Sequence, residues 1–218
     1  MDRLAKEFKG EYRIKSEKPL IVPLRDISDK DDREMIRQTV TDHYTNYIEN
    51  LPDHVGFLLR NYRPVDYAIK VVGVGSVGTL CSIILLEGRD KKDPFFLQIK
   101  QTTKSVLEEY LNPSKYELSG ERVVEGQRLM QTVSDIFLGW TSDEKRERHY
   151  YWRQLKDWKG SGDVENATES EMKSYTDLRG KTLARAHARS GDPVAISGYM
   201  GKSEKFDKAI TVFAEKYA

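Results

Sequence analysis

Hydrophobic positions recur with two different periods along this chain, and each change of period marks a change of structure. From Ser28 to Pro52, apolar and tyrosine side chains recur at helical spacing behind a cluster of acidic residues. Further on, short runs rich in β-branched and aromatic residues predict strands at 67–72, 79–86, 95–100, 136–140 and 149–155. Helical spacing returns at 120–134, 169–189 and 204–217, with a short helix predicted at 105–111. The order predicts an α+β fold with a helix between the third and fourth of five strands.

These patterns divide the chain into three predicted segments. Residues 1–66 are mainly helical, residues 67–158 form the sheet with its helix, and residues 159–218 are helical again. Before the first helix, charged and apolar residues alternate, and Pro19 and Pro23 keep part of the chain extended. Ser28 is the predicted cap of that helix.

Composition and charge narrow the classes of function. The 218 residues suit one domain or two small ones, with 38% hydrophobic and 33% charged residues. The net charge is only +1, from 36 basic and 35 acidic side chains, so there is no global reason to bind nucleic acid or membranes. No apolar run approaches the roughly 20 residues that span a bilayer, and the charged start does not resemble a signal peptide. With a single cysteine, Cys81, these features predict a cytoplasmic protein.

A glycine motif, Gly73-x-Gly75-x-x-Gly78, follows the first predicted strand. Such glycines let backbone N–H groups approach phosphate oxygens. A dinucleotide-binding unit would continue into a helix, but Thr79 to Leu86 predicts a strand. A strand–loop–strand arrangement is the phosphate cover of protein kinases, in which Gly73, Gly75, Ser76 and Gly78 would cover the phosphates. Leu80 would then take the apolar position after the last glycine. The alternative is a hairpin that binds no ligand.

Further residues stand where a kinase-type site requires them. Lys100 ends the third apolar run and would contact the α- and β-phosphates of ATP, unless it is only a solvated lysine. Glu125, on the helix before the fourth strand, is the preferred partner of that lysine. Its rivals are Glu121, Glu108 and Glu109, and any of them could instead belong to a solvated face. By position alone, residues 153–158 form the hinge, where the backbone of Gln154 and Leu155 would bond an adenine edge.

The catalytic half of such a site is missing from the sequence. Kinases carry an aspartate followed five residues later by an asparagine, and none of the five asparagines here has that spacing. There is no Asp-Phe-Gly, and the four histidines have no metal-ligand spacing. Gly191-Asp192 resembles the approach to a catalytic loop, but Ser197 occupies the asparagine place, so His187 and Asp192 are interpreted as a helix end and its turn. The sequence thus offers no catalytic residue and no metal ligand.

Several runs carry a family resemblance. They are VVGVGSVGT, LLEGRD, DPFFLQIK, SVLEEYL, GERVVEGQRLMQTVSDIFLGW, YYWRQLKDWKGS, LARAHARSGD, ISGYMG and FDKAITVFAEKYA. From Val71 to Tyr217 the chain resembles the domain of unknown function 2252 family of bacterial proteins, whereas residues 1–66 match less distinctly. Members look like relatives of the protein-kinase-like phosphotransferases, with Gly-Asp-x-His-x-x-Asn and Asp-Phe-Asp motifs placed before the glycine loop, in a permuted order. This sequence begins after the point where those motifs would stand.

The resemblance implies a C-terminal portion, or a natural short form, of such a protein. Its fold would be kinase-like, with a five-stranded antiparallel sheet of the N-lobe type flanked by helices from a partial C-lobe. We expect a nucleotide-binding module that uses ATP and Mg²⁺ in transfer to a small molecule or protein. The alternative is a noncatalytic interaction or regulatory domain, and a dinucleotide-dependent oxidoreductase is a third hypothesis that needs a helix after Gly78. Apolar surface exposed by an incomplete lobe would favour a homodimer.

Overall fold

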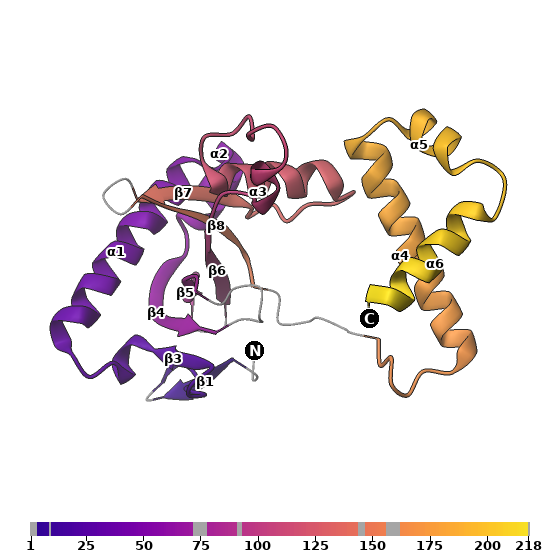
Figure 1. The fold of residues 1–218 in the computed structure, drawn as a ribbon. Coiled ribbons are helices and arrows are strands. Elements are labelled where there is room, and N and C mark those ends of the chain that lie inside the picture. The colour runs from indigo at the N-terminus through magenta and orange to yellow at the C-terminus, as the bar shows by residue number, and fades with distance from the viewer. Residues whose placement is uncertain are drawn as a thin grey trace. The chain divides into compact units, whose positions relative to one another are not determined.

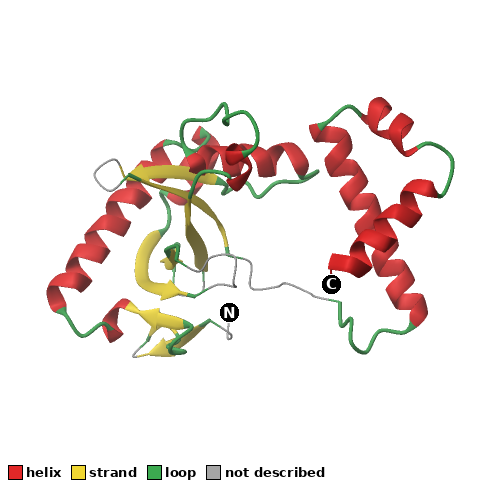
Figure 2. Cartoon of the chain, viewed as in Figure 1, coloured by secondary structure: helices red, strands yellow, loops and turns green. Residues whose placement is uncertain are grey.

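The chain divides into two compact units. A computed structural model describes residues 4–8, 10–71, 78–90, 93–143, 147–155 and 162–217. The first unit comprises residues 1–126 and 134–160, and the second comprises residues 127–133 and 161–218. The N-terminal segment 1–66 and the predicted sheet segment both belong to the first unit. Figures 1 and 2 show the elements of each unit.

A six-stranded antiparallel sheet forms the first unit, in the order β3-β4-β5-β6-β8-β7. Its strands are β3 (Ile21–Pro23), β4 (Arg63–Lys70), β5 (Cys81–Glu87), β6 (Pro94–Thr102), β7 (Gly139–Asp143) and β8 (Arg148–Gln154). The predicted α+β class is confirmed, and the five predicted strands correspond to β4, β5, β6, β7 and β8. The predicted strand count was wrong, because β3 adds a sixth strand at the edge beside β4. With only three residues, β3 is too short to show the alternation that identifies a strand.

The N-terminal residues also form a separate two-stranded sheet. Strands β1 (Ala5–Phe8) and β2 (Glu11–Ile14) pair in antiparallel fashion. Their alternation of charged and apolar residues was visible in the sequence, but we interpreted it only as an extended segment. Ala5 and Ile14 are buried in a core cluster with Ile83 and Leu85 of β5, so this small sheet packs on one face of the large one.

Helix α1 (Lys30–Glu49) covers the opposite face of the large sheet. Its cap is Asp29, which accepts a hydrogen bond from the Asp32 amide (2.9 Å), and not the predicted Ser28. Tyr44 and Tyr47 are buried in the main core against the strands, so the tyrosine stripe of this helix is core packing. Figure 1 shows α1 running alongside the sheet.

The remaining helices connect or follow the strands. The first unit contains α2 (Asp53–Leu59) and the 3-10 helices Leu24–Asp26 and Val106–Glu109. Helix α3 (Ser119–Met130) lies between β6 and β7 in the chain, as predicted, and its last residues are assigned to the second unit. The second unit also contains α4 (Glu169–Ser190), α5 (Pro193–Met200) and α6 (Lys205–Tyr217).

Helices α4, α5 and α6 have no buried core of their own. None of the residues in 162–217 is buried, and large apolar side chains such as Val194 (79% exposed) and Tyr199 (83%) face outward.

Within the described residues, every helix is too short or too polar to cross a membrane.

Candidate functional site

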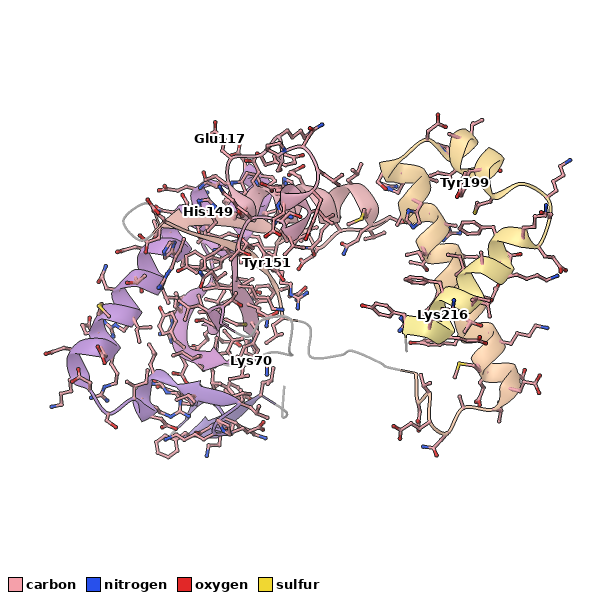
Figure 3. All side chains as sticks on the ribbon, in the orientation of Figure 1. Lys70, Glu117, His149, Tyr151, Tyr199 and Lys216 are labelled. Atoms are coloured by element: carbon pink, nitrogen blue, oxygen red, sulfur yellow. The ribbon has the colours of Figure 1, made fainter. Side chains whose placement is uncertain are left out.

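One row of side chains crosses the sheet beside the glycine-rich segment. Lys100 of β6 is paired with Cys81 of β5 on one side and with Tyr151 of β8 on the other. Lys70 ends β4, one residue beyond the pair Ile69–Ser82, so the register brings it next to Cys81. Residues at paired positions project to the same face of an antiparallel sheet. Lys70 and Tyr151 of this row are labelled in Figure 3.

A second row, two residues along each strand, supports the first. Gln98 is 2% exposed and donates a hydrogen bond from Nε2 to the Cys81 Sγ (3.4 Å). Its Oε1 accepts a hydrogen bond from Nε of Arg153 (2.9 Å). The buried amide therefore fixes the Arg153 guanidinium on the face that carries Lys100.

The electrostatic character of this face is cationic. Lys70, Lys100 and Arg153 are half-buried, and each lies close enough to Cys81 to act electrostatically on its thiol. Among the residues that the structure describes, no carboxylate forms an ion pair with any of these three side chains. Half-buried cations without a carboxylate partner favour an anion, because partial burial weakens the screening by water.

The buried carboxylates of the sheet already have partners of their own. Asp66 (8% exposed) accepts a hydrogen bond from Arg25 (2.7 Å), and Glu87 (7% exposed) accepts one from Arg63 (2.9 Å). Neither is therefore an open ligand for Mg²⁺, which prefers carboxylate and phosphate oxygens.

Burial governs the chemistry of Cys81 and Tyr151. Burial raises the pKa of the Cys81 thiol, and the charges of Lys100, Lys70 and Arg153 together with the Gln98 hydrogen bond oppose that rise. The pKa of Tyr151 is also raised, first by burial and then by Cys81, while Arg153 lowers it. Both groups are therefore neutral at pH 7, and the positive charge of this face comes from its lysines and arginine.

We expect Cys81 to react slowly with iodoacetamide in the folded protein. The thiolate is the reactive species, and the thiol is only 4% exposed with a raised pKa. At pH 8 the rate should be well below that in urea, because burial blocks access of the reagent and the raised pKa lowers the thiolate fraction. Mass spectrometry of samples quenched at successive times measures the rate of Cys81 alkylation. Equal rates in the folded and unfolded chain would show that the thiol is neither buried nor protonated as the structure indicates.

The glycine motif lies largely outside the described residues. Gly73, Gly75 and Ser76 fall there, so their predicted contacts with phosphates stay predictions. Gly78 is described, with φ of +81°, and a Cβ added there would meet no atom within 4 Å. The next regular element is β5, a strand that begins at Cys81, so the helix required by the oxidoreductase hypothesis is absent after Gly78.

Leu80 does not share a face with Lys100. It lines a pocket on the α1 side of the sheet together with Ile99, whereas Lys100, the next residue of β6, belongs to the opposite face. Cys81 is the residue after the glycine motif that lies opposite Lys100. The kinase signature places its apolar residue two positions after the last glycine, which is Leu80 here, and the strand register puts that position on the face away from Lys100.

Helix α3, which carries Glu125, begins on the face of Lys100. The Ser119 amide donates a hydrogen bond to Nδ1 of His149 (3.0 Å), a residue two positions before Tyr151 on β8. A Cβ at Gly120 would lie only 2.4 Å from the carbonyl oxygen of Tyr150, so glycine permits this close contact. Lys100 forms no ion pair with Glu125 or with any other described carboxylate, so the orienting role of Glu125 stays a prediction.

The predicted hinge residues use their amides within the chain. The Gln154 N–H donates to the Asp135 carboxylate (2.7 Å), and the Leu155 N–H donates to the Phe96 carbonyl (3.0 Å). An adenine edge would therefore have to use their carbonyl groups, and the hinge residues 156–158 lie outside the described part of the chain.

Sequence reasoning missed three members of the cationic face. Lys70, Gln98 and Arg153 belong to it through strand register alone, and the spacing of Gln98 and Lys100 at i and i+2 was the available signal.

Asp192 is the N-cap of α5, and its side chain accepts hydrogen bonds from the amides of Val194 (2.9 Å) and Ala195 (3.0 Å). The structure thus agrees with our interpretation of Asp192 as part of a helix-end turn.

These features define a mixed α+β protein with a cationic sheet face beside a glycine-rich segment. Over residues 1–218 the chain matches the model of the family described as "Uncharacterized protein conserved in bacteria (DUF2252)". The chain belongs to this family, and the predicted resemblance is confirmed. The match also includes residues 1–66, where the resemblance was less distinct. Searches of curated proteins and of solved structures found no match.

Proposed function

We propose that the cationic sheet face binds the phosphates of ATP, in a nucleotide-binding module of the kinase type. The observation that carries the proposal is the set of three half-buried cations, Lys70, Lys100 and Arg153, without a described carboxylate partner. Lys100 would act as the phosphate-binding lysine of the third strand. Arg153, held by Gln98, offers a fixed guanidinium that suits a phosphate oxygen pair.

The arrangement of elements supports this proposal. Lys100 lies on the strand that follows the glycine hairpin, and α3 follows that strand and starts on the same face. The glycine-rich segment between Lys70 and Cys81 would cover the phosphates with its backbone N–H groups, through Gly73, Gly75, Ser76 and Gly78. Since Asp66 and Glu87 already have partners, Mg²⁺ would enter as the nucleotide complex, held mainly by phosphate oxygens.

Replacing Lys100 with alanine is expected to weaken ATP binding at least tenfold, which corresponds to about 1.4 kcal/mol. The experiment is a calorimetric titration of the whole chain with ATP and Mg²⁺. Lys104→Ala is the matched control, because Lys104 is an exposed lysine four residues further on, outside the strand. We expect it to bind ATP within about twofold of the parent, as a solvent-exposed charge contributes little.

Two results of this titration would contradict the proposal. One is a Lys100→Ala variant that binds ATP as tightly as the parent, and the other is a folded parent chain that does not bind ATP. Circular dichroism of each sample shows whether it is folded. Transfer to a small-molecule or protein acceptor would be assayed separately by the release of ADP.

The second candidate is a noncatalytic interaction or regulatory domain. Helices α4, α5 and α6 favour it, because residues 162–217 include no buried side chain and expose Val194, Tyr199 and Phe213. Apolar surface of this kind is typical of a binding surface. ATP binding without ADP release would support this candidate over a catalytic module, and the predicted homodimer stays a prediction.

A further inference from the structure

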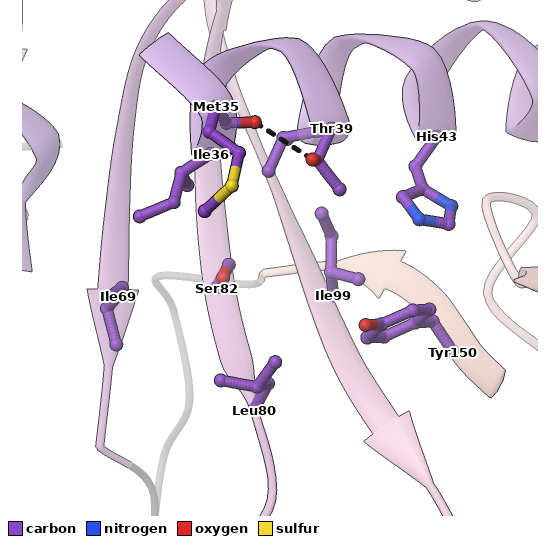
Figure 4. Close-up of a pocket in the computed structure, with 10 residues that line it drawn as sticks. Met35, Ile36, Thr39, His43, Ile69, Leu80, Ser82, Ile99 and Tyr150 are labelled. Atoms are coloured by element: carbon purple, nitrogen blue, oxygen red, sulfur yellow. Dashed lines mark hydrogen bonds between the residues drawn. The ribbon is translucent and has the colours of Figure 1, made fainter. Parts of the chain in front are cut away.

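A pocket of about 120 Å³ lies between α1 and the sheet, on the face opposite Lys100. Figure 4 shows its two walls: α1 contributes residues from Met35 to His43, and the sheet side contributes Ile69, Leu80 and Ile99 among others. Met35 (49% exposed) and Leu80 (43%) remain partly accessible, so a ligand can reach the pocket from solvent.

The lining of this pocket disfavours a negatively charged ligand. None of its ten residues is Asp, Glu, Lys or Arg. Thr39 already donates its hydroxyl hydrogen bond to the Met35 carbonyl (2.8 Å), as the dashed line in Figure 4 shows. A carboxylate or phosphate placed here would lose its hydration without a lysine or arginine partner, which costs several kcal/mol.

The size and the ring chemistry favour an aromatic ligand. Apolar cavities of about 150 Å³ in proteins bind benzene, and this pocket has a similar scale. At one end the rings of His43 and Tyr150 meet edge to face, with centroids 5.1 Å apart and planes at 66°. A third ring would find the same kind of contact there, since aromatic rings prefer offset or edge-to-face neighbours.

We propose that this pocket binds a small neutral molecule built on a single aromatic ring, at a site separate from the cationic face. Strand alternation keeps the two sites on opposite faces, because Ile69, Ser82 and Ile99 line the pocket while their neighbours Lys70, Cys81 and Lys100 form the cationic row. Ile69 and Leu80 stand close to either end of the glycine-rich segment, so the ligand would contact both of its flanks.

Toluene is the probe, and methyl NMR of the whole chain is the measurement. We expect saturable shifts of the Ile69 and Ile99 methyl groups, whereas Ile14 and Ile21, which belong to the other core cluster, should not respond. Benzoate carries the same ring with a carboxylate and should bind at least tenfold more weakly.

A matched pair of variants locates the ligand. Thr39 and Thr45 both lie on α1 and both donate a hydroxyl hydrogen bond to the carbonyl four residues earlier, but only Thr39 lines the pocket. Thr39→Phe should therefore abolish the toluene shifts, and Thr45→Phe should keep them. Ser82→Leu fills the pocket from the sheet and replaces Thr39→Phe if that variant does not fold. The proposal is overturned by an absence of saturable shifts in the parent, by benzoate binding as tight as toluene, or by toluene binding that survives in a folded pocket-filling variant.

Discussion

Replacing Trp152 with alanine is expected to lower the free energy of unfolding by about 3–5 kcal/mol. Trp152 is fully buried at the centre of the main core. Its ring stacks on Tyr47 of α1, with centroids 4.5 Å apart and planes at 9°, so the substitution empties the contact that joins α1 to β8. Since domains are stable by only about 5–15 kcal/mol, the loss would be a large part of the total. Urea unfolding followed by circular dichroism measures the free energy of unfolding of the parent and the variant.

Two further variants separate packing from hydrogen bonding at this position. Trp152→Phe keeps an aromatic ring but removes the Nε1 hydrogen bond to the buried Thr141 hydroxyl (2.9 Å), and should cost about 1–3 kcal/mol. Tyr199→Ala, at an 83% exposed position, should change stability by less than about 0.5 kcal/mol. A loss below about 1 kcal/mol for Trp152→Ala would contradict the central place of this side chain in the core.

The strands were predictable where the sequence carries long runs of β-branched and aromatic residues. Strands β5 and β6 are recognisable because β5 is buried along almost its whole length and β6 is buried at its centre, over residues 96–99. The prediction at 136–140 was displaced, since the observed strand β7 begins at Gly139. The cause is Asp135, which accepts hydrogen bonds from the Phe137 amide (2.9 Å) through its side chain and from the Leu138 amide (3.1 Å) through its carbonyl, and so bends the chain into a turn.

The candidate site was predictable only in part, because strand register decides which side chains share a face. Lys100 stands out as a lysine at the end of an apolar run, and the structure places it on β6, a central strand of the sheet. The contributions of Lys70 and Arg153 depend on pairings between strands that lie far apart in the sequence. A shift of one residue reverses the face, as Leu80 and Cys81 illustrate, and composition does not contain that information.

Register also links the two proposals. One face of β5 and β6 presents Cys81 and Lys100 toward the cationic row, and the other presents Ser82 and Ile99 toward the apolar pocket. Both faces lie beside the glycine-rich segment, so charge and apolar surface are separated by the thickness of a single sheet. A phosphate and a neutral ring can therefore bind close to each other without competing for the same side chains.

Replacing Asp66 with alanine is the second large effect that we expect, about 2–4 kcal/mol of destabilisation. One carboxylate oxygen of Asp66 accepts hydrogen bonds from the Ile14 amide (2.9 Å) and from Arg25 (2.7 Å), and the other accepts one from the Tyr67 amide (3.0 Å). Removing it leaves the buried Ile14 amide without its acceptor. Because Arg25 is 38% exposed, water replaces part of its lost interaction, which keeps the cost below that of a fully buried pair.

The loss should be concentrated where β2 meets β4, since Asp66 connects these strands. Hydrogen exchange of the Ile14 amide should accelerate at least tenfold in Asp66→Ala, while amides in the centre of β5 change only as far as global stability falls. Asp177→Ala is the contrasting variant, because Asp177 and Lys181 form an exposed pair (2.7 Å) on α4 that should contribute less than about 0.5 kcal/mol. Equal losses in the two variants would mean that the Asp66 carboxylate is hydrated and that the small sheet is held by its apolar contacts alone.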